Sequence, residues 1–217
     1  MKRLLIMGPA GAGKGTIAEK IKEEYRLAHV ATGNMFRTEI AAKSELGSKA
    51  KEYIDAGKLV PDELTIAMVM KRLSQDDCVN GFLLDGFPRT LNQAEALSVA
   101  LNEKGVDLQL AINLMVDEEV LGMRIEGRRI CPTCDAIYHL KNSPPLREGI
   151  CDRCGSELYQ RSDDTREQLA VRLKEYEEIT KPVLTYYRNL GIVADIEAAG
   201  TPDEVWQKVA VALADLE

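Results

Sequence analysis

The chain contains 217 residues, of which 45% are hydrophobic and 29% are charged, and its formal net charge at pH 7 is −7. This length and hydrophobic content suit one compact α/β domain with insertions and argue against a disordered chain. The acidic balance argues against broad nucleic-acid binding, which usually requires a basic face, and no apolar run approaches the roughly 18 residues of a membrane span.

The first residues form a short apolar run that ends at a glycine. Because residues 4–7 are too few for the hydrophobic part of a signal peptide, we interpret 3–7 as a buried strand and expect a cytoplasmic protein. A helix over 13–25 and a second short strand are predicted next. Thr32 and Asn34 then have side chains suited to cap the following helix.

Strands and helices continue to alternate along the rest of the chain. Further strands are predicted at 82–84, 108–116 and 192–196. Further helices are predicted across 35–56 in two pieces, from 61, over 117–126, from 165 and from 202. This alternation predicts a parallel sheet with helices on both faces. Two segments, 32–60 and 127–164, interrupt the pattern and are interpreted as inserts.

The sequence GPAGAGKGT at 8–16 lies between a predicted strand and a predicted helix, which is the context of a phosphate-binding loop. Glycines let several backbone N–H groups point at phosphates, the following helix adds its positive end, and Lys14 supplies a full charge. The usual pattern is broken at one place, because Gly15 stands at the hydroxyl position and Thr16 follows it. Such a loop indicates a nucleotide but does not separate a kinase from a GTPase or an ATPase.

Four of the five cysteines form two C-x-x-C pairs, Cys131 with Cys134 and Cys151 with Cys154, separated by sixteen residues. This spacing is typical of zinc sites, and four thiolates leave no open coordination position, so the predicted metal is structural. Fe or Co would also suit such a site. His139 is a possible substitute ligand, and Cys78 is interpreted as a bystander.

The phosphate loop resembles that of nucleoside monophosphate kinases, in which GKGT is the usual ending. ATGNMFR at 31–37, DAGKLVPDEL at 55–64 and GFLLDGFPRT at 81–90 are similar to the acceptor-site motifs of adenylate kinases. GRRICPTC and RSDD extend the match into the segment that carries the cysteines. The resemblance covers nearly the whole chain and points to the long-lid, metal-binding bacterial form of that family.

The resemblance implies a P-loop three-layer fold around a parallel sheet, with a small helical AMP-binding insert and a metal-stapled lid. The expected division is a core with the phosphate loop at 1–31, an AMP-binding insert at 32–60, core at 61–126, the lid at 127–164 and core at 165–217. The implied reaction is reversible, Mg²⁺-dependent phosphoryl transfer, ATP + AMP = 2 ADP, which keeps adenine nucleotides in balance. ATP, AMP and ADP are the expected partners, without nucleic acid or membrane, and a monomer is typical of the family.

The resemblance also implies roles for individual residues. The residues expected to bind ATP are Gly11, Ala12, Gly13, Lys14, Gly15, Thr16, Arg124, Arg128, Ile137, Tyr138 and Gly200. The residues expected to bind AMP are Thr32, Gly33, Arg37, Lys58, Leu59, Val60, Gly86, Phe87, Pro88, Arg89, Gln93, Arg161 and Arg172. The residues expected to act in catalysis are Lys14, Arg37, Arg89, Arg128, Arg161, Arg172, Asp85, Asp163 and Asp164.

Simpler interpretations exist for most of these residues. Each arginine taken alone reads as a solvated surface charge, although Arg89 directly follows the end of a strand, where ligands bind in open α/β sheets. Arg172 could extend its charge to solvent beside the apolar stripe of a long helix. Asp163 and Asp164 also suit the start of a helix.

Three other functions remain open at this point. The nearest is a kinase for another monophosphate, such as UMP or GMP, although Thr32, Gln93 and the long lid favour AMP. The second is a regulatory P-loop NTPase that hydrolyses ATP without an acceptor. The third is a zinc-ribbon protein that binds nucleic acids, which the negative charge and the phosphate loop disfavour.

Overall fold

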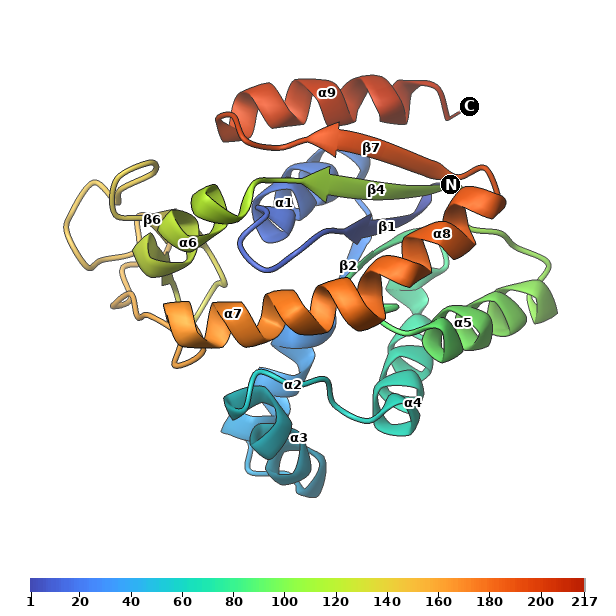
Figure 1. Ribbon diagram of the computed structural model, residues 1–217, viewed down its shortest axis with the longest axis horizontal. Coiled ribbons are helices and arrows are strands. Elements are labelled where there is room, and N and C mark those ends of the chain that lie inside the picture. The colour runs from blue at the N-terminus through green and yellow to red at the C-terminus, as the bar shows by residue number, and fades with distance from the viewer. Residues whose placement is uncertain (217) are drawn as a thin grey trace.

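The computed structural model describes residues 1–216, and in these residues a parallel sheet of five strands forms the centre of the molecule (Figure 1). The strands of this sheet are β1 (Arg3–Met7), β2 (Ala28–Ala31), β3 (Phe82–Asp85), β4 (Leu110–Met115) and β7 (Val193–Glu197). Their order across the sheet is β2-β3-β1-β4-β7, and each neighbouring pair is parallel. The α/β fold of P-loop kinases predicted from the sequence is therefore confirmed.

Helices cover both faces of the sheet, and two segments extend away from it. The helices are α1 (Lys14–Tyr25), α2 (Thr32–Ala41), α3 (Glu45–Asp55), α4 (Asp62–Leu73), the short η1 (Asp76–Cys78), α5 (Leu91–Glu103), α6 (Glu118–Gly127), α7 (Arg166–Glu175), the π-turn η2 (Tyr176–Thr180), α8 (Lys181–Asn189) and α9 (Pro202–Ala214). A short antiparallel pair, β5 (Arg128–Ile130) and β6 (Ile137–His139), lies outside the central sheet.

The first strand shows why the sheet strands read as continuous apolar runs. Successive side chains of a strand point to opposite faces. Leu4 and Ile6 pack in one core with residues of α1 and α9, whereas Leu5 and Met7 pack in the other with residues of α4, α5 and α8. Since both faces are covered, neither can be polar.

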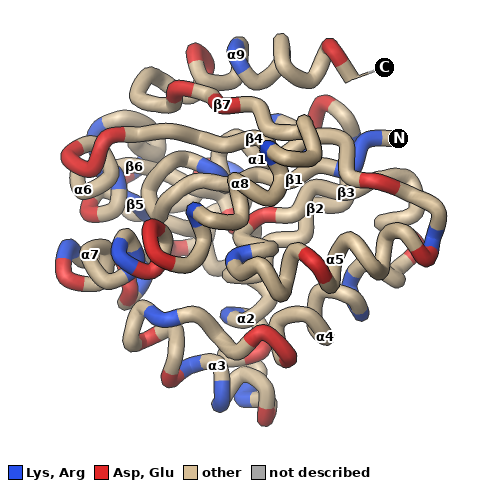
Figure 2. The backbone as a smooth tube through the Cα atoms, turned by 45° about the vertical axis from the view of Figure 1, so that its right-hand side comes forward, with Lys and Arg blue, Asp and Glu red and all other residues tan. Residues whose placement is uncertain are grey.

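The two extended segments have small cores of their own. In the first, Phe36, Ala50 and Val60 form a cluster where α2 and α3 pack together. In the second, the buried cluster consists mainly of Cys131, Cys151, Ala136 and Tyr138. Residues of both signs lie on the surface helices α3 and α7, as Figure 2 shows. No helix within residues 1–216 combines the length and the apolarity that crossing a membrane requires.

Some local predictions were wrong. Helix α2 already includes Thr32, so the cap position falls on Ala31, whose side chain has no oxygen with which to cap. The Thr32 hydroxyl donates to the carbonyl of Gly86 at 2.9 Å. Helix α5, which the sequence analysis did not predict, is capped by Thr90, whose hydroxyl accepts from Gln93 N–H at 3.1 Å.

The long helix predicted from 165 onward is interrupted. The wider turn η2 separates α7 from α8 directly before Pro182, which has no N–H to continue the regular hydrogen-bond ladder. Two other boundaries differ by a few residues. The strand predicted at 108–116 spans Leu110–Met115, and the one predicted at 192–196 spans Val193–Glu197.

The contact between α2 and α3 yields a stability prediction. A Cβ at Gly47 would lie 2.2 Å from the carbonyl oxygen of Glu39, which is backbone and cannot move aside. Gly47→Ala should therefore destabilise this segment, by about 1–3 kcal/mol for overpacking, and speed hydrogen exchange in α2 and α3. Gly122→Ala is the matched control, because Gly122 is also helical but a Cβ there meets nothing within 4 Å. Equal exchange rates in the two variants would contradict the close packing.

Candidate active site

The backbone of the loop between β1 and α1 turns sharply at three glycines. Gly8, Gly11 and Gly13 have φ values of 135°, 85° and 93°, in the left-handed region that favours glycine. A Cβ at Gly8 would also lie 2.7 Å from the carbonyl oxygen of Leu114. The Lys14 ammonium donates to the carbonyls of Gly8 and Pro9, both at 2.8 Å. These two bonds tie the start of the helix to the start of the loop.

The electrostatics of Lys14 favour a negative partner. Burial lowers the pKa of Lys14 to about 7, against the opposing attraction of Asp85 and together with repulsion from Arg89 and Arg172. A phosphate group at this place would restore the charged form, since an opposite charge nearby stabilises an ammonium.

Asp85 lies at the carboxyl end of β3, beside the phosphate loop, because β1 and β3 are neighbours and Ile6 pairs with Asp85. His29 lies between two carboxylates, with Nε2 at 3.6 Å from Asp85 Oδ2 and Nδ1 at 3.5 Å from Glu19 Oε1. Burial disfavours the charged imidazole, but the two carboxylates prevail and raise the pKa of His29 to about 9. His29 is thus a positive partner of Asp85 that the sequence analysis did not identify.

Arginines from separate segments surround two buried carboxylates. Arg128 binds Asp164 through both ends of its guanidinium group, with Nε at 2.8 Å from Oδ2. Arg172 Nη1 lies 3.1 Å from Asp163 Oδ2, and Arg37 Nη2 lies 3.6 Å from the same oxygen. The structure therefore brings together arginines that are distant in the chain.

The remaining arginines complete this cluster. Arg161 Nη2 donates to the side-chain oxygen of Asn34 at 3.3 Å, and its Nε is buried without a hydrogen-bond partner. Arg89 Nε donates to the carbonyl of Gly86 at 2.9 Å. An unpartnered guanidinium nitrogen in a buried place is a donor that an incoming anion can use.

The charges in the cluster hold one another ionised. Burial lowers the pKa of Arg161 and of Arg172 to about 10, so both remain protonated at neutral pH. Burial alone would raise the pKa of Asp163, but Arg172, Arg37 and Arg161 hold it below its ordinary value. Asp163 and Asp164 are only 7% and 1% exposed, which means that their main stabilisation comes from these guanidinium groups.

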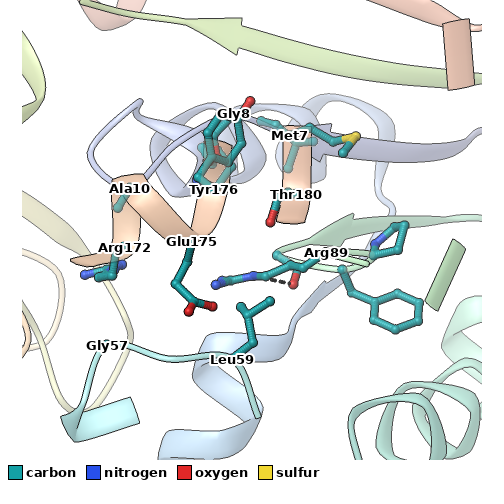
Figure 3. A pocket seen from close by; sticks show the side chains of 15 residues that line it. Met7, Gly8, Ala10, Gly57, Leu59, Arg89, Arg172, Glu175, Tyr176 and Thr180 are labelled. Carbon is teal, nitrogen blue, oxygen red and sulfur yellow. Dashed lines mark hydrogen bonds between the residues drawn. The ribbon is translucent and has the colours of Figure 1, made fainter. Parts of the chain in front are cut away.

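Two adjoining cavities share Arg89 and Arg172 in their linings. Figure 3 shows the first of them, with both arginines labelled. The first is bordered by the phosphate loop at Gly8, Ala10 and Lys14. The second is lined by residues predicted to bind AMP, namely Thr32, Gly33, Arg37, Lys58, Leu59, Val60, Gly86, Arg89, Gln93 and Arg172. Phe87 and Pro88 line the first cavity. The guanidinium groups thus stand where the two cavities join.

Three residues of the first cavity come from a segment that sequence reasoning did not link to the site. Glu175, Tyr176 and Thr180 line it from the end of α7 and the π-turn that follows. In Figure 3, the carboxylate of Glu175 and the guanidinium group of Arg89 point into the cavity from opposite elements. The only available signal was Pro182, which marks an irregular helix but does not reveal which side chains the irregularity presents.

Four further residues predicted to bind ATP fall into two groups. Arg124 Nη2 donates to the carbonyls of Ala199 and Gly200, both at 3.1 Å, so Arg124 and Gly200 lie together beside the phosphate loop. Ile137 reaches this loop from the cysteine-rich segment, since a Cβ at Gly15 would lie 2.8 Å from Ile137 Cδ1. Tyr138 is instead buried within that segment.

The hydroxyl of Tyr138 accepts a hydrogen bond from Asp152 N–H at 2.8 Å. Any contact of this residue with a nucleotide would therefore come from its main chain.

The four paired cysteines bring their sulfur atoms within 4.8 Å of one another. The Sγ atoms of Cys131 and Cys154 are 3.3 Å apart, and those of Cys134 and Cys151 are 3.6 Å apart. A disulfide would hold two sulfurs at about 2.05 Å, whereas thiolates about 2.3 Å from one tetrahedral ion lie about 3.8 Å apart. The donor set therefore fits a metal ion.

The other two candidates do not join this group. His139 Nε2 lies 3.2 Å from the carbonyl of Met123, and its Nδ1 accepts from the N–H groups of Lys141 and Asn142. Cys78 is buried in the core near Arg72, whose Nη1 is 3.0 Å from its sulfur.

Comparison with known proteins agrees with these features. A family model described as adenylate kinase matches residues 6–192. An adenylate kinase of Carboxydothermus hydrogenoformans is 52% identical over 211 residues, which cover 97% of this chain and 99% of that protein. An adenylate kinase of Clostridioides difficile is 48% identical, with 97% and 98% covered, and one of Caldanaerobacter subterraneus is 49% identical, with 97% and 96% covered.

The cysteine cluster yields a prediction about metal content. Purified protein should contain one tightly bound ion per chain, and Cys134→Ser should lose it, because the remaining thiolates no longer close the tetrahedron. Elemental analysis measures the ion, and hydrogen exchange over 128–160 should show that the segment loosens. Cys78→Ala is the control for loss of a thiol and should retain the ion. The cluster would not be a metal site if both variants had the same metal content.

Proposed function

The chain belongs to the adenylate kinase family and catalyses ATP + AMP = 2 ADP, and from this premise we propose which residues hold the two nucleotides. The observation that carries the proposal is that Arg89 and Arg172 stand at the junction of two cavities, one at the phosphate loop and the other at the predicted acceptor motifs. Phosphoryl transfer requires donor and acceptor phosphates to meet in line at such a place.

On the donor side, the N–H groups of residues 11–16 and the ammonium of Lys14 hold the phosphates of ATP. Arg124 lies against the adenine, near Gly200, to which it already donates a hydrogen bond. Ile137 covers the loop from the lid. Closing this side excludes water, which would otherwise compete with AMP as the acceptor.

On the acceptor side, Arg37 and Arg89 bind the phosphate of AMP. Thr32 and Gln93 face its base, with Gly33, Lys58, Leu59 and Val60 around them. Gly86, Phe87 and Pro88 shape the turn that presents Arg89. The planar fork of an arginine suits a phosphate because it donates two parallel hydrogen bonds and stays protonated.

Between the two phosphates, Arg128, Arg161 and Arg172 stabilise the charge of the transferring group. Asp163 and Asp164 hold the guanidinium groups of Arg128 and Arg172 in place before substrates bind, as their ion pairs indicate. The phosphates would then replace the carboxylates as partners. Stabilisation of this kind is effective because the donors are in position before the reaction begins.

Two metal ions have different tasks in this proposal. Adenylate kinases use Mg²⁺ with the nucleotide, where it neutralises charge on the phosphates. Asp85 fits a role in orienting the waters of that ion, because its side chain is 15% exposed at the loop and offers an oxygen ligand. The cysteines hold a structural Zn²⁺, with Fe or Co as alternatives, which staples a segment with a very small core.

The two extended segments act as moving parts. Residues 32–60 carry the acceptor motifs, residues 127–164 form the lid, and the segments 1–31, 61–126 and 165–217 form the core. Lid and core are in contact here, since Arg153 lies 3.8 Å from Glu19 and 3.7 Å from Glu23 of α1. We expect a cytoplasmic monomer, and the net charge of −7 supports the absence of general nucleic-acid binding.

A coupled assay with each nucleoside monophosphate tests the choice of acceptor. With ATP and Mg²⁺, AMP should be far better than UMP or GMP, measured as kcat/KM. A clear preference for UMP or GMP would contradict the assignment of the second cavity to AMP. Hydrolysis of ATP at the same rate with and without AMP would contradict the proposed exclusion of water.

A first prediction concerns Lys14. Lys14→Met should lower kcat/KM at least about a hundredfold, the scale of losing one preorganised contact to the phosphates. Lys20→Met is the matched control, because Lys20 is on the same helix and pairs with the exposed Asp203 at 2.9 Å. Steady-state kinetics at saturating AMP provide the measurement. Near-normal turnover of folded Lys14→Met protein would refute the loop assignment.

A second prediction concerns the fork of Arg89. Arg89→Lys keeps the charge but loses the paired donors, so kcat should fall and the KM for AMP should rise, each at least about tenfold. Arg72→Lys removes a similar fork, which binds Asp77 at 2.8 Å and 2.6 Å outside the two cavities, and should leave both constants unchanged. If the two lysine variants have the same kinetics, Arg89 does not hold the acceptor phosphate.

A further inference from the structure

Asp62 lies in the first turn of α4 and accepts hydrogen bonds from three side chains of the neighbouring helix and its cap. Its Oδ1 accepts from Gln93 Nε2 at 2.7 Å, and its Oδ2 accepts from the Thr90 hydroxyl at 2.8 Å and from Asn92 Nδ2 at 3.0 Å. The Thr90 hydroxyl in turn accepts from the main-chain N–H of Gln93 at 3.1 Å. The carboxylate is therefore held in one orientation.

The amide of Gln93 is fixed at both of its atoms. Its oxygen accepts from the main-chain N–H of Arg89 at 2.8 Å, and its nitrogen donates to Asp62. An ionised carboxylate can only accept and a main-chain N–H can only donate. In the reverse orientation, the amide oxygen of Gln93 would face the carboxylate of Asp62 and the amide nitrogen would face the N–H of Arg89, and neither pair can form a hydrogen bond. Gln93 is 2% exposed and lines the second cavity, so solvent does not offer it other partners.

A fixed amide has a consequence for reading a purine base. After these two bonds, Gln93 still has one N–H to donate and one lone pair to offer. Adenine carries a donor amino group at position 6 and an acceptor at N1, whereas a 6-oxo purine carries an acceptor oxygen and a donor N1–H. A freely turning amide would match either base by turning over. An amide that cannot turn over matches only one of them.

We propose that Asp62 is a specificity-determining positioning residue, which locks the amide of Gln93 in the orientation that accepts adenine and rejects 6-oxo purines. This inference rests on the proposed function, because it requires Gln93 to face the base of the acceptor nucleotide. Asp62 acts through Gln93 and does not itself contact the substrate. The rejection arises because the wrong base leaves buried polar groups of the site unpaired.

The test compares AMP with IMP, which differs in having an oxygen at position 6 and a proton on N1. Wild-type protein should prefer AMP by at least about a hundredfold in kcat/KM. Asp62→Asn keeps the shape but can donate as well as accept, so only the main-chain N–H of Arg89 still opposes the reverse orientation of Gln93. The preference for AMP should therefore fall roughly tenfold, while the KM for ATP stays unchanged. Glu63→Gln is the matched control, since it removes an exposed acidic group from the same first turn of α4.

Gln93→Ala distinguishes a failure of the proposed role of Gln93 from a failure of the proposed role of Asp62. Unchanged kinetics with AMP in that variant would remove Gln93 from the acceptor site and with it the proposed function of the residue. A raised KM for AMP in Gln93→Ala, together with an undiminished AMP preference in Asp62→Asn, would overturn the role of Asp62 and leave the role of Gln93 intact.

A measurement without turnover tests the lock itself. In nucleotide-free protein, the side-chain amide proton of Gln93 that faces Asp62 should exchange slowly with solvent by NMR, and Asp62→Asn should speed this exchange at least tenfold. Fast exchange in the wild-type protein would overturn the proposal even if the variant failed to fold.

Discussion

The arrangement of the molecule depends on gathering several guanidinium groups in one largely buried place. Positive charges repel at such distances, so the cluster exists only because Asp163 and Asp164 are buried among them. Arg37, Arg128 and Arg172, which come from three separate segments of the chain, pair with these two carboxylates. Asp163 and Asp164, which lie where the lid meets α7, therefore also hold the positive charges of the cluster together.

The sheet explains why the donor site lies beside this cluster. Because β1 and β3 are adjacent and parallel, the phosphate loop after β1 and Asp85 with its following turn after β3 emerge at the same edge. The turn then presents Arg89 to both cavities. The second cavity is completed by residues from α2, from 57–60 and from α5, so two cavities lie at a single edge of the sheet.

Local motifs were predictable from the sequence because each has its own chemistry. The glycines with Lys14 needed only a strand before them and a helix after them, and the cysteine spacing needed only the geometry of a tetrahedral ion. Hydrophobic runs located most strands for the same reason. In contrast, helix α5, the partner of Asp85 at His29 and the cavity residue Glu175 depend on contacts between distant segments. Thr32 is another example, because its hydroxyl suits a helix cap, but the helix already includes Thr32 and the hydroxyl donates to Gly86, which lies 54 residues away.

The central claim is that the cluster of arginines exchanges its carboxylate partners for substrate phosphates. It is tested most directly by a crystal structure with Mg²⁺ and a compound in which two adenosines are joined through five phosphates. The account predicts one adenosine near Arg124 and the other near Gln93, with phosphate oxygens within hydrogen-bond distance of Arg37, Arg89, Arg128, Arg161 and Arg172. Phosphates bound away from these groups, with Arg37, Arg128 and Arg172 still paired to Asp163 and Asp164, would contradict it.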